Sequence, residues 1–336
     1  MTASVISLDG HHIDTPAALT ALAMPNHSAL LALGQALRQR GYGFTTITPA
    51  SHKRINARAS SAWACDLGGI FGWSRPFAGS LPPPEIIDLM HAAGIVDDDH
   101  GVLRSRLRAS TLGGQLYFHS AYPTSDDDAV FFGPDTYRFV RALRAGLASL
   151  ARPVTRVADI GCGAGPGAIT VGLACPAAAV LAIDINPAAL ALTRINADLA
   201  GAANVTPIES NLLGATDGVF DLIMSNPPYM ADREQRAYRD GGGDLGAGLS
   251  IAIVEAAMAR LAPGGTLMLY TGVACIGKAD PFRAAAEPML QAARCHWTYD
   301  EIDPDVFGEE LDTATYANAD RIAAVWLCAR MPGTTA

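Results

Sequence analysis

The sequence predicts an α/β protein built on a doubly wound, mostly parallel sheet. From residue 152 onward, short apolar runs alternate with helix-like segments, an order typical of parallel strands joined by crossover helices. A glycine-rich turn joins the first run to the first helix. Two late runs lack a full helix between them, so we expect them to form an antiparallel edge of the sheet. The expected parallel strands are 154–159, 180–184, 204–208, 219–225 and 266–271, and the late pair is 295–302 and 321–329.

The chain before this region predicts a separate module. A length of 336 residues is typical of about two domains. Leucines recur at helical spacing near the N-terminus, and a second helix is expected over 85–93. Two strands, 102–109 and 115–119, are expected to meet at a glycine pair as a hairpin. Helices followed by a hairpin indicate a small winged-helix-like unit, a fold that does not by itself decide function.

Composition narrows the possible partners and compartments. The net charge of −9 disfavours a large nucleic-acid footprint, which needs clustered Lys and Arg. The longest apolar stretch, 171–183, is interrupted by Pro176 and is too short to span a bilayer. The N-terminus lacks a basic segment followed by an apolar run, so no signal peptide is expected. The six cysteines show no zinc spacing, which favours reduced thiols in a cytoplasmic protein without a bound metal.

Two local features each allow two interpretations. Arg104, Arg106 and Arg108 alternate along the expected strand 102–109, so we expect them on one solvated face, with contact to an acidic partner or RNA as the alternative. The carboxylate-rich segment 303–310 is expected to be a solvated loop, with a rim over a substrate pocket as the alternative.

A glycine-rich turn is the first candidate binding site. Asp159 ends the first strand, and glycines at 161, 163 and 165 permit a tight turn and close approach of a ligand to the backbone. The helix behind the turn begins with unpaired N–H groups. Asp184 ends the next apolar run about twenty residues later, where a carboxylate can accept from two ribose hydroxyls of a bound nucleoside.

The sequence Asn226-Pro227-Pro228-Tyr229 is the second candidate site, at the end of the run 219–225. Two prolines end the strand's hydrogen-bond ladder and leave a rigid bend with free carbonyl oxygens. A planar nitrogen fits such a corner: its N–H groups can donate to the Asn226 side-chain oxygen and the Pro227 carbonyl while the Tyr229 ring stacks. The alternative is an ordinary turn at the end of a strand.

Two cofactors fit the glycine turn, a dinucleotide and S-adenosylmethionine. The glycines stand on alternate positions rather than in the Gly-x-Gly-x-x-Gly spacing of dinucleotide sites. An acid in front of the turn, Asp159, suits an ammonium group better than a phosphate. The chain here resembles the class I S-adenosylmethionine-dependent methyltransferases. With the Asn-Pro-Pro-Tyr sequence, the resemblance narrows to enzymes that methylate glutamine side chains of translation release factors, and to their relatives acting on adenine or guanine amino groups.

The resemblance covers roughly residues 130 to 330 and implies specific ligand-binding positions. The stretch 131–137 stands where the glutamine methyltransferases carry a Pro-Arg-Pro-Glu-Thr-Glu segment over the cofactor, and Gly133 and Tyr137 replace its Arg and its closing Glu. Asn211 stands where relatives carry an acid that meets the adenine amino group. The implied cofactor-binding residues are Pro134, Thr136, Asp159, Gly161, Gly163, Gly165, Asp184, Ile185, Asn211, Leu212 and Asn226, and the implied catalytic residues are Asn226, Pro227, Pro228 and Tyr229.

The expected activity is methyl transfer from S-adenosylmethionine to a planar nitrogen by in-line displacement, with catalysis by positioning. A protein glutamine is the favoured acceptor. A small metabolite and an RNA amino group are the alternatives, and a cofactor-binding module without activity is the rival class. We expect residues 1–125 to recognise the substrate, 126–151 to form a linker and a helix covering the cofactor, and 152–332 to form the methyltransferase domain.

Overall fold

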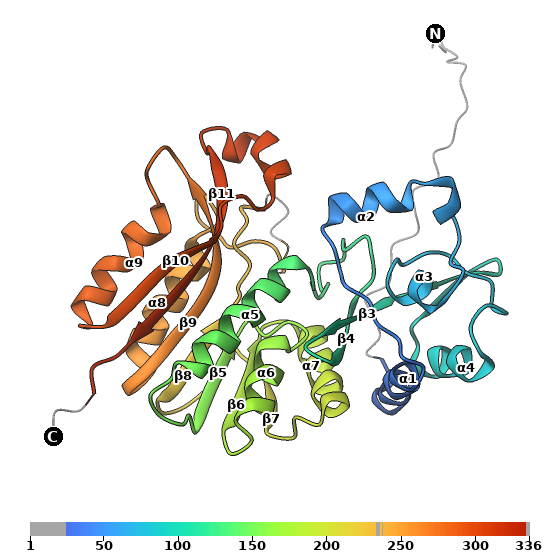
Figure 1. The fold of residues 1–336 in the computed structure, drawn as a ribbon, viewed down its shortest axis with the longest axis horizontal. Coiled ribbons are helices and arrows are strands. Elements are labelled where there is room, and N and C mark those ends of the chain that lie inside the picture. The colour runs from blue at the N-terminus through green and yellow to red at the C-terminus, as the bar shows by residue number, and fades with distance from the viewer. Residues whose placement is uncertain (1–24, 233–235, 237, 334–336) are drawn as a thin grey trace, which may run out of the picture.

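The computed structural model describes residues 25–232, 236 and 238–333. Within these residues, a seven-stranded sheet has the order β10-β11-β9-β8-β5-β6-β7 (Figure 1). The five strands from β9 to β7 are parallel, and β11 runs antiparallel between β9 and β10, so the predicted sheet and its antiparallel edge are confirmed. The strands are β5 (Arg156–Ile160), β6 (Ala179–Asp184), β7 (Val205–Glu209), β8 (Phe220–Ser225), β9 (Leu261–Cys275), β10 (His296–Asp303) and β11 (Arg321–Arg330).

Helices cover both faces of this sheet, as a doubly wound fold requires. Helices α5, α6 and α7 pack beside one another, and α8 packs against α9. The strand β5 alternates between the two layers: Val157 belongs to one hydrophobic core and Ala158 to the other. The helices are α5 (Pro134–Ala148), α6 (Pro166–Ala174), α7 (Pro187–Ala200), α8 (Gly248–Arg260) and α9 (Pro281–Ala292), and short 3-10 turns follow at η2 (Gly308–Asp312) and η3 (Ala314–Tyr316).

The N-terminal module contains short helices and two β-hairpins. The helix predicted over 85–93 is confirmed, and it ends at Gly94 in the left-handed conformation. The hairpin predicted at the glycine pair is also confirmed, with Leu112 paired to Gln115. The elements are α1 (His27–Gln39), α2 (Pro49–Asn56), η1 (Ala59–Ser61), α3 (Leu67–Phe71), α4 (Pro84–Ala93), β1 (Val96–Asp99), β2 (Val102–Ser105), β3 (Leu107–Leu112) and β4 (Gln115–Ser120). Residues 1–24 of the predicted module lie outside the described part of the chain.

The prediction of one continuous strand over 102–109 is wrong. The strand is interrupted at Arg106, because β2 pairs with β1 whereas β3 pairs with β4. At the break, the Ser105 hydroxyl donates to the Leu107 carbonyl oxygen over 2.6 Å. The three arginines therefore do not share a solvated face: Arg104 is exposed, but Arg108 is only 3 % exposed.

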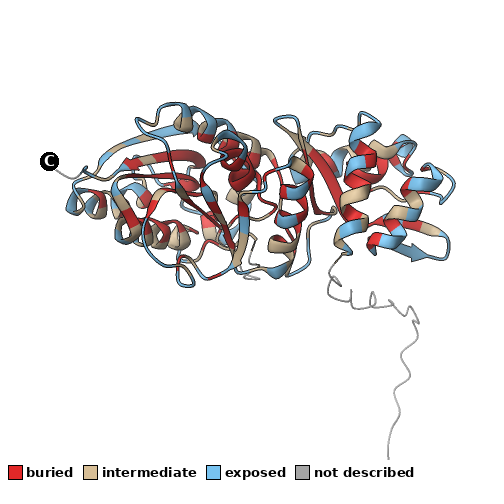
Figure 2. Cartoon of the chain, turned by 90° about the horizontal axis from the view of Figure 1, so that it is seen from below, coloured by how far each residue is buried: buried red, intermediate tan, exposed pale blue. Residues whose placement is uncertain are grey.

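The module and the sheet share one continuous core. Buried residues of α1, β4 and α7 belong to the same hydrophobic cluster, and Figure 2 shows buried segments in both parts of the molecule. At the contact, the fully buried Asn196 of α7 accepts from the Phe118 N–H over 2.8 Å and donates to the Phe118 carbonyl over 3.0 Å. It also donates to the carbonyl of Ala164 in the glycine turn, over 2.9 Å. Among the described residues, no helix has the length and apolar character that crossing a bilayer needs.

Replacing Asn196 by Ala is expected to lower the free energy of unfolding by roughly 2–4 kcal/mol. The change leaves the N–H and carbonyl groups that it bonded buried without partners. Urea unfolding followed by circular dichroism measures this loss. Arg194→Ala, at an exposed position of the same helix, is the matched control and should stay within about 0.5 kcal/mol of the wild type. Equal stability of the two variants would contradict the role given to Asn196.

Candidate active site

A pocket of about 210 Å³ lies at the carboxyl ends of the parallel strands. Strand register explains its composition. Ile160 of β5 pairs with Ile183 of β6 and with Ser225 of β8, so the residue that follows each of them faces the same edge of the sheet. Of the predicted site residues, the pocket is lined by Thr136, Asp159, Gly161, Gly163, Asp184, Ile185, Asn211, Leu212, Asn226, Pro227, Pro228 and Tyr229, whereas Pro134 and Gly165 do not line it.

The glycine turn is shaped by left-handed backbone. Gly161, Gly163 and Gly165 have φ of 70°, 54° and 83°, values that favour glycine. A Cβ atom at Gly161 or Gly163 would meet nothing within 4 Å, so the backbone there faces open space. A Cβ at Gly165 would lie 2.9 Å from the Thr193 hydroxyl. Gly165 therefore allows α6 and α7 to pack closely, and the other two glycines form the wall of the pocket.

Asp159 is a buried acid at the floor of the site. Its carboxylate accepts from the N–H of Ala168, in the first turn of α6, over 2.7 Å. Burial raises its pKa from 3.8 to about 7, the Ala168 bond opposes that rise, and the charge of Asp184 adds to it. A cation bound beside Asp159 would favour the ionised form, so the group is suited to an ammonium ligand.

Asp184 lies at the end of β6, where the sequence predicts a carboxylate that accepts hydrogen bonds from ribose hydroxyls. Its two carboxylate oxygens accept from the N–H groups of Gly163, over 2.9 Å, and Asn186, over 3.0 Å. Burial raises its pKa, and these backbone bonds oppose the rise. A carboxylate has about four lone-pair positions, so the side chain can accept further bonds from the pocket that it lines.

Asn226 directly follows β8 and lines the same pocket. The Ser225 hydroxyl donates to the Ile160 carbonyl over 2.6 Å and holds the end of β8 against β5. The half-buried Asn226 side chain forms no hydrogen bond with any described residue, although it lines the pocket. Its amide oxygen is therefore available to a ligand, beside the buried Pro227.

Tyr229 is held by packing. Its ring lies edge-on to Phe307 with the ring centres 5.9 Å apart. A Cβ atom added at Gly272 would lie 2.2 Å from the ring, so the ring rests directly on the backbone of β9. Its buried hydroxyl forms no hydrogen bond of normal geometry with a described residue. Burial raises the pKa of this phenol well above its usual value, and the nearby Asp135 carboxylate adds to the rise.

Asp135 is a site residue that sequence reasoning missed. It is 4 % exposed and lines the pocket from the first turn of α5. Its carboxylate accepts from the Tyr270 hydroxyl over 2.7 Å and from the Arg138 guanidinium over 3.1 Å. Its position within 131–137, opposite an acid of the relatives' segment, was the available signal.

The two departures from the relatives' segment have visible consequences. A side chain at Gly133 would meet the Phe131 ring, because an added Cβ would lie 2.5 Å from it. The Tyr137 hydroxyl accepts from the Thr46 N–H over 3.0 Å, so this residue contacts the N-terminal module. Phe131 itself lines the pocket.

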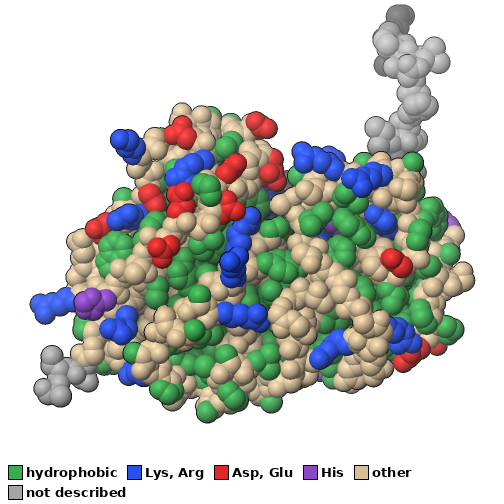
Figure 3. Space-filling view, in the orientation of Figure 1, with side chains coloured by type: hydrophobic (Ala, Val, Ile, Leu, Met, Phe, Trp, Pro, Cys, Tyr) green, Lys and Arg blue, Asp and Glu red, His purple; other side chains and the backbone are tan. Residues whose placement is uncertain are grey.

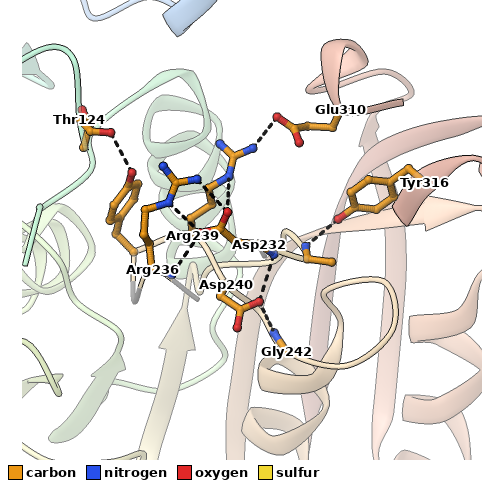
Figure 4. Close-up of polar contacts among 10 residues, drawn as sticks. Thr124, Asp232, Arg236, Arg239, Asp240, Gly242, Glu310 and Tyr316 are labelled. Atoms are coloured by element: carbon orange, nitrogen blue, oxygen red, sulfur yellow. Dashed lines mark hydrogen bonds and ion pairs between the residues drawn. The ribbon is translucent and has the colours of Figure 1, made fainter. Parts of the chain in front are cut away.

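The segment after the proline corner forms one wall of the pocket, shown in Figure 4. Asp232 accepts twice from the Arg236 guanidinium, each time over 2.7 Å, and these bonds hold the pKa of Asp232 below its usual range. Arg239 pairs with Glu310, and the Tyr238 hydroxyl donates to the Thr124 carbonyl over 2.8 Å. The wall is thus fixed to the N-terminal module on one side and to η2 on the other.

The carboxylate-rich segment 303–310 lies at the rim of the pocket. Phe307 lines the pocket, which supports the rim rather than a purely solvated loop. Glu310 bonds Arg239, and Asp303 pairs with Arg138 over 2.9 Å. In Figure 3, acidic side chains gather over this part of the molecule, whereas basic side chains gather over α2.

Taken with the parallel sheet, this geometry defines the class of protein: a class I methyltransferase that uses S-adenosylmethionine. The family model "Methyltransferase small domain" matches residues 141–272. A release factor glutamine methyltransferase of Deinococcus radiodurans is 34 % identical over 216 residues, an alignment that covers 61 % of this chain and 73 % of that protein. The chain belongs to the release factor glutamine methyltransferase family.

The chain is also similar to a second curated methyltransferase and to a solved structure. A 4-amino-L-phenylalanine/4-methylamino-L-phenylalanine methyltransferase of Streptomyces pristinaespiralis is 30 % identical over 179 residues, covering 49 % of this chain and 59 % of that protein. The solved structure of the M. jannaschii tRNA m1G37 methyltransferase aligns with a TM-score of 0.44 and 17 % identity, covering 68 % of this chain and 58 % of the other.

The residues present fit S-adenosylmethionine. Open space faces the backbone at Gly161 and Gly163, and Asp184 beside it keeps lone pairs for hydroxyl donors. Asp159 supplies a buried carboxyl that a cation would ionise. Asn211 is exposed and lines the same pocket, with no side-chain bond to a described residue. We expect Asp159 to face the ammonium group, Asp184 the ribose and Asn211 the adenine.

The raised pKa of Asp159 predicts a pH dependence of cofactor binding. An ammonium ligand binds the ionised carboxylate, so affinity for S-adenosylhomocysteine should rise with pH up to about 7, by at most tenfold per pH unit, and then level off. Binding should also release a proton below that pH. Without ligand, the same shift makes the free energy of unfolding fall as pH rises from about 4 to about 7, because the unfolded chain ionises first.

Calorimetric titration in buffers of different ionisation enthalpy measures both the affinity and the proton release. Asp159→Asn should bind more weakly and show no pH slope in this range. Asp217→Asn, at an exposed position away from the pocket, should keep the slope of the wild type. A slope that persists in Asp159→Asn would assign the titration to another group.

Proposed function

We propose that this enzyme methylates the side-chain nitrogen of a glutamine in a protein, and that a translation release factor is the acceptor. The observation that carries the proposal is the Asn226 side chain, which lines the pocket beside the Pro227 carbonyl and has no partner among the described residues. These two oxygens can accept both N–H groups of a planar carboxamide. The names of the relatives support glutamine as the acceptor.

Positioning is the main catalytic task in this proposal. S-adenosylmethionine supplies an electrophilic methyl group when bound. The lone pair of an amide nitrogen is delocalised, so the nitrogen is a weak nucleophile and must be held in line with that group. Bonds from its N–H groups to Asn226 and Pro227 would strengthen as positive charge develops on nitrogen. As the new N–C bond forms, the bond from the methyl group to sulfur would break, and the nitrogen would then lose one of its two protons to solvent. Tyr229, fixed between Phe307 and Gly272, gives the acceptor a rigid aromatic wall.

The alternative acceptors have weaker support. The relative named for 4-amino-L-phenylalanine is similar over a shorter stretch than the glutamine methyltransferase of D. radiodurans. Nucleic acid is disfavoured by charge, because binding its phosphates needs clustered Lys and Arg, whereas this chain is acidic. The net charge of the chain is −9.

We extend the proposal to the organisation of the chain. The N-terminal module, 1–125, recognises the acceptor, and the helix α5 within 126–151 covers the cofactor. In support, Asp135, Thr136 and Phe139 of α5 line the pocket, and Tyr238 ties the pocket wall to Thr124. The proposal also places the enzyme in the cytoplasm, where its acceptor is made. All six cysteines are free thiols, which supports a reducing compartment.

The acceptor assignment predicts a selective reaction. The enzyme should add one methyl group to a glutamine-containing peptide from a release factor, and mass spectrometry of the fragmented product should locate it on the glutamine side chain. The same peptide with Asn in place of that Gln is the matched control and should stay unmodified. Methylation of 4-amino-L-phenylalanine with no reaction on the peptide or on an intact release factor would reject the protein acceptor.

Asn226→Ala is expected to lower the single-turnover rate by about 10²–10³, equivalent to roughly 3–4 kcal/mol of transition-state stabilisation. Its affinity for S-adenosylhomocysteine should change little, because the lost bonds are made to the acceptor. Asn211→Ala, a second asparagine lining the same pocket, should show the opposite division, with weaker cofactor binding by about 1 kcal/mol and a nearly unchanged rate at saturation. A wild-type rate in Asn226→Ala would show that the Asn-Pro-Pro-Tyr sequence is only a turn at the end of a strand, without a catalytic role.

A further inference from the structure

A second pocket of about 220 Å³ adjoins the active site. Its walls come from both parts of the chain: the N-terminal module contributes His52, Arg108 and Tyr122, and the catalytic domain contributes Arg236. Phe131, Tyr238 and Arg239 line both pockets, so the two pockets are neighbours. A single peptide could therefore place one side chain in the first pocket and another in the second. The roles assigned above to the cofactor and to the glutamine nitrogen use the first pocket and leave the second without a function.

Arg108 gives the second pocket an uncompensated positive charge. Its side chain is 3 % exposed, and its Nε donates to the Ser120 carbonyl over 3.0 Å. Among the described residues, no carboxylate pairs with Arg108, and none lines this pocket. Burial lowers its pKa to about 10, so the guanidinium stays charged at neutral pH. A buried cation without an acid is costly, and an anionic ligand would offset that cost.

The other two arginines of this pocket already have acids. Arg236 forms two bonds to Asp232, and Arg239 pairs with Glu310 and lies 3.7 Å from Asp232. Their charges are therefore balanced within the wall shown in Figure 4. One positive charge remains for a ligand, which matches a carboxylate better than a phosphate dianion.

His52 adds an acceptor to the second pocket. Its Nε2 lies 2.9 Å from the Trp73 carbonyl, and since a carbonyl can only accept, Nε2 carries the proton. Burial lowers the pKa of His52 to about 4, so the ring is neutral at pH 7. Its Nδ1 is then a buried acceptor without a partner among the described residues. A peptide offers both complements, a carboxylate for Arg108 and an N–H for an unfilled acceptor.

We propose that this second pocket binds a carboxylate of the methyl acceptor, next to the glutamine whose nitrogen lies at Asn226. The carboxylate is an Asp or Glu side chain of the acceptor, or its chain terminus. This inference rests on the proposed function. The second pocket shares Phe131, Tyr238 and Arg239 with the first, so a carboxylate bound at Arg108 would fix the direction in which the acceptor runs from Asn226.

The test uses peptides with a single glutamine and one Asp placed in turn at each position around it, each paired with the same peptide carrying Asn. Dissociation constants are measured by calorimetry with S-adenosylhomocysteine bound, and kcat/KM is measured for methyl transfer. At the favoured position, Asp should improve binding by about ten- to a hundredfold over Asn. Peptides that end in a free carboxylate or an amide distinguish a chain terminus from a side chain.

Variants tie this preference to the pocket. Arg108→Gln should abolish the difference in affinity between each Asp peptide and its Asn counterpart, whereas Arg104→Gln, at an exposed arginine of β2, should keep that difference. Arg108→Lys retains the charge and should keep part of the preference, which covers the case in which Arg108→Gln does not fold.

The outcomes separate the two proposals. Methylated glutamine peptides with equal affinity for Asp and Asn at every position would overturn the carboxylate pocket and leave the function standing. An Arg108-dependent Asp preference without methylation of any glutamine would support the pocket and overturn the function. Tighter binding of a phosphoserine peptide than of its Asp counterpart would overturn the choice of a carboxylate.

Discussion

The register of β5 between its two neighbours is the constraint on which the site depends. Ile160 pairs with Ile183 on one side and with Ser225 on the other. One residue further on, the three chains supply the glycine turn, Asp184 and Asn226. A slip of one residue in either ladder would turn one of these side chains to the opposite face of the sheet. The Ser225 bond to the Ile160 carbonyl reinforces one of the two ladders at the point where the prolines end it.

The parts of the site that could be predicted from the sequence are those set by a short stretch of chain. The glycine turn, Asp184 and the proline corner could be predicted because each follows an apolar run, and parallel strands end at one edge. Residues that reach the pocket through tertiary packing could not. Phe307 arrives from the far edge of the sheet, and Tyr238 and Arg239 belong to a wall fixed by bonds to Thr124 and Glu310. No spacing in the sequence encodes those contacts.

Some residues lie differently from what the sequence suggests, and the reasons are physical. A period of two along 102–109 assumes one continuous ladder, but the partner strand changes at Arg106, and Arg108 turns inward. Gly165 matched the motif but serves the contact of α6 with Thr193. Pro134 begins α5 beside two residues that do line the pocket, because only one side of a helical turn faces it. In each case the sequence shows the type of residue, but it does not show which part of the structure that residue faces.

Asn196 has a consequence beyond stability. The strand β4 carries both the Ser120 carbonyl that accepts from Arg108 and the Phe118 backbone that bonds Asn196, and Asn196 in turn bonds Ala164 of the glycine turn. Hydrogen bonds at two positions of β4, joined by the strand itself, thus connect the pocket between the two parts with the backbone of the glycine turn. Any coupling that this connection transmits is reciprocal: an acceptor that tightens cofactor binding by some factor is itself bound more tightly, by the same factor, once the cofactor is present. Such linkage would favour the ternary complex over either binary one, and the enzyme would then hold its donor most firmly when a substrate is in place.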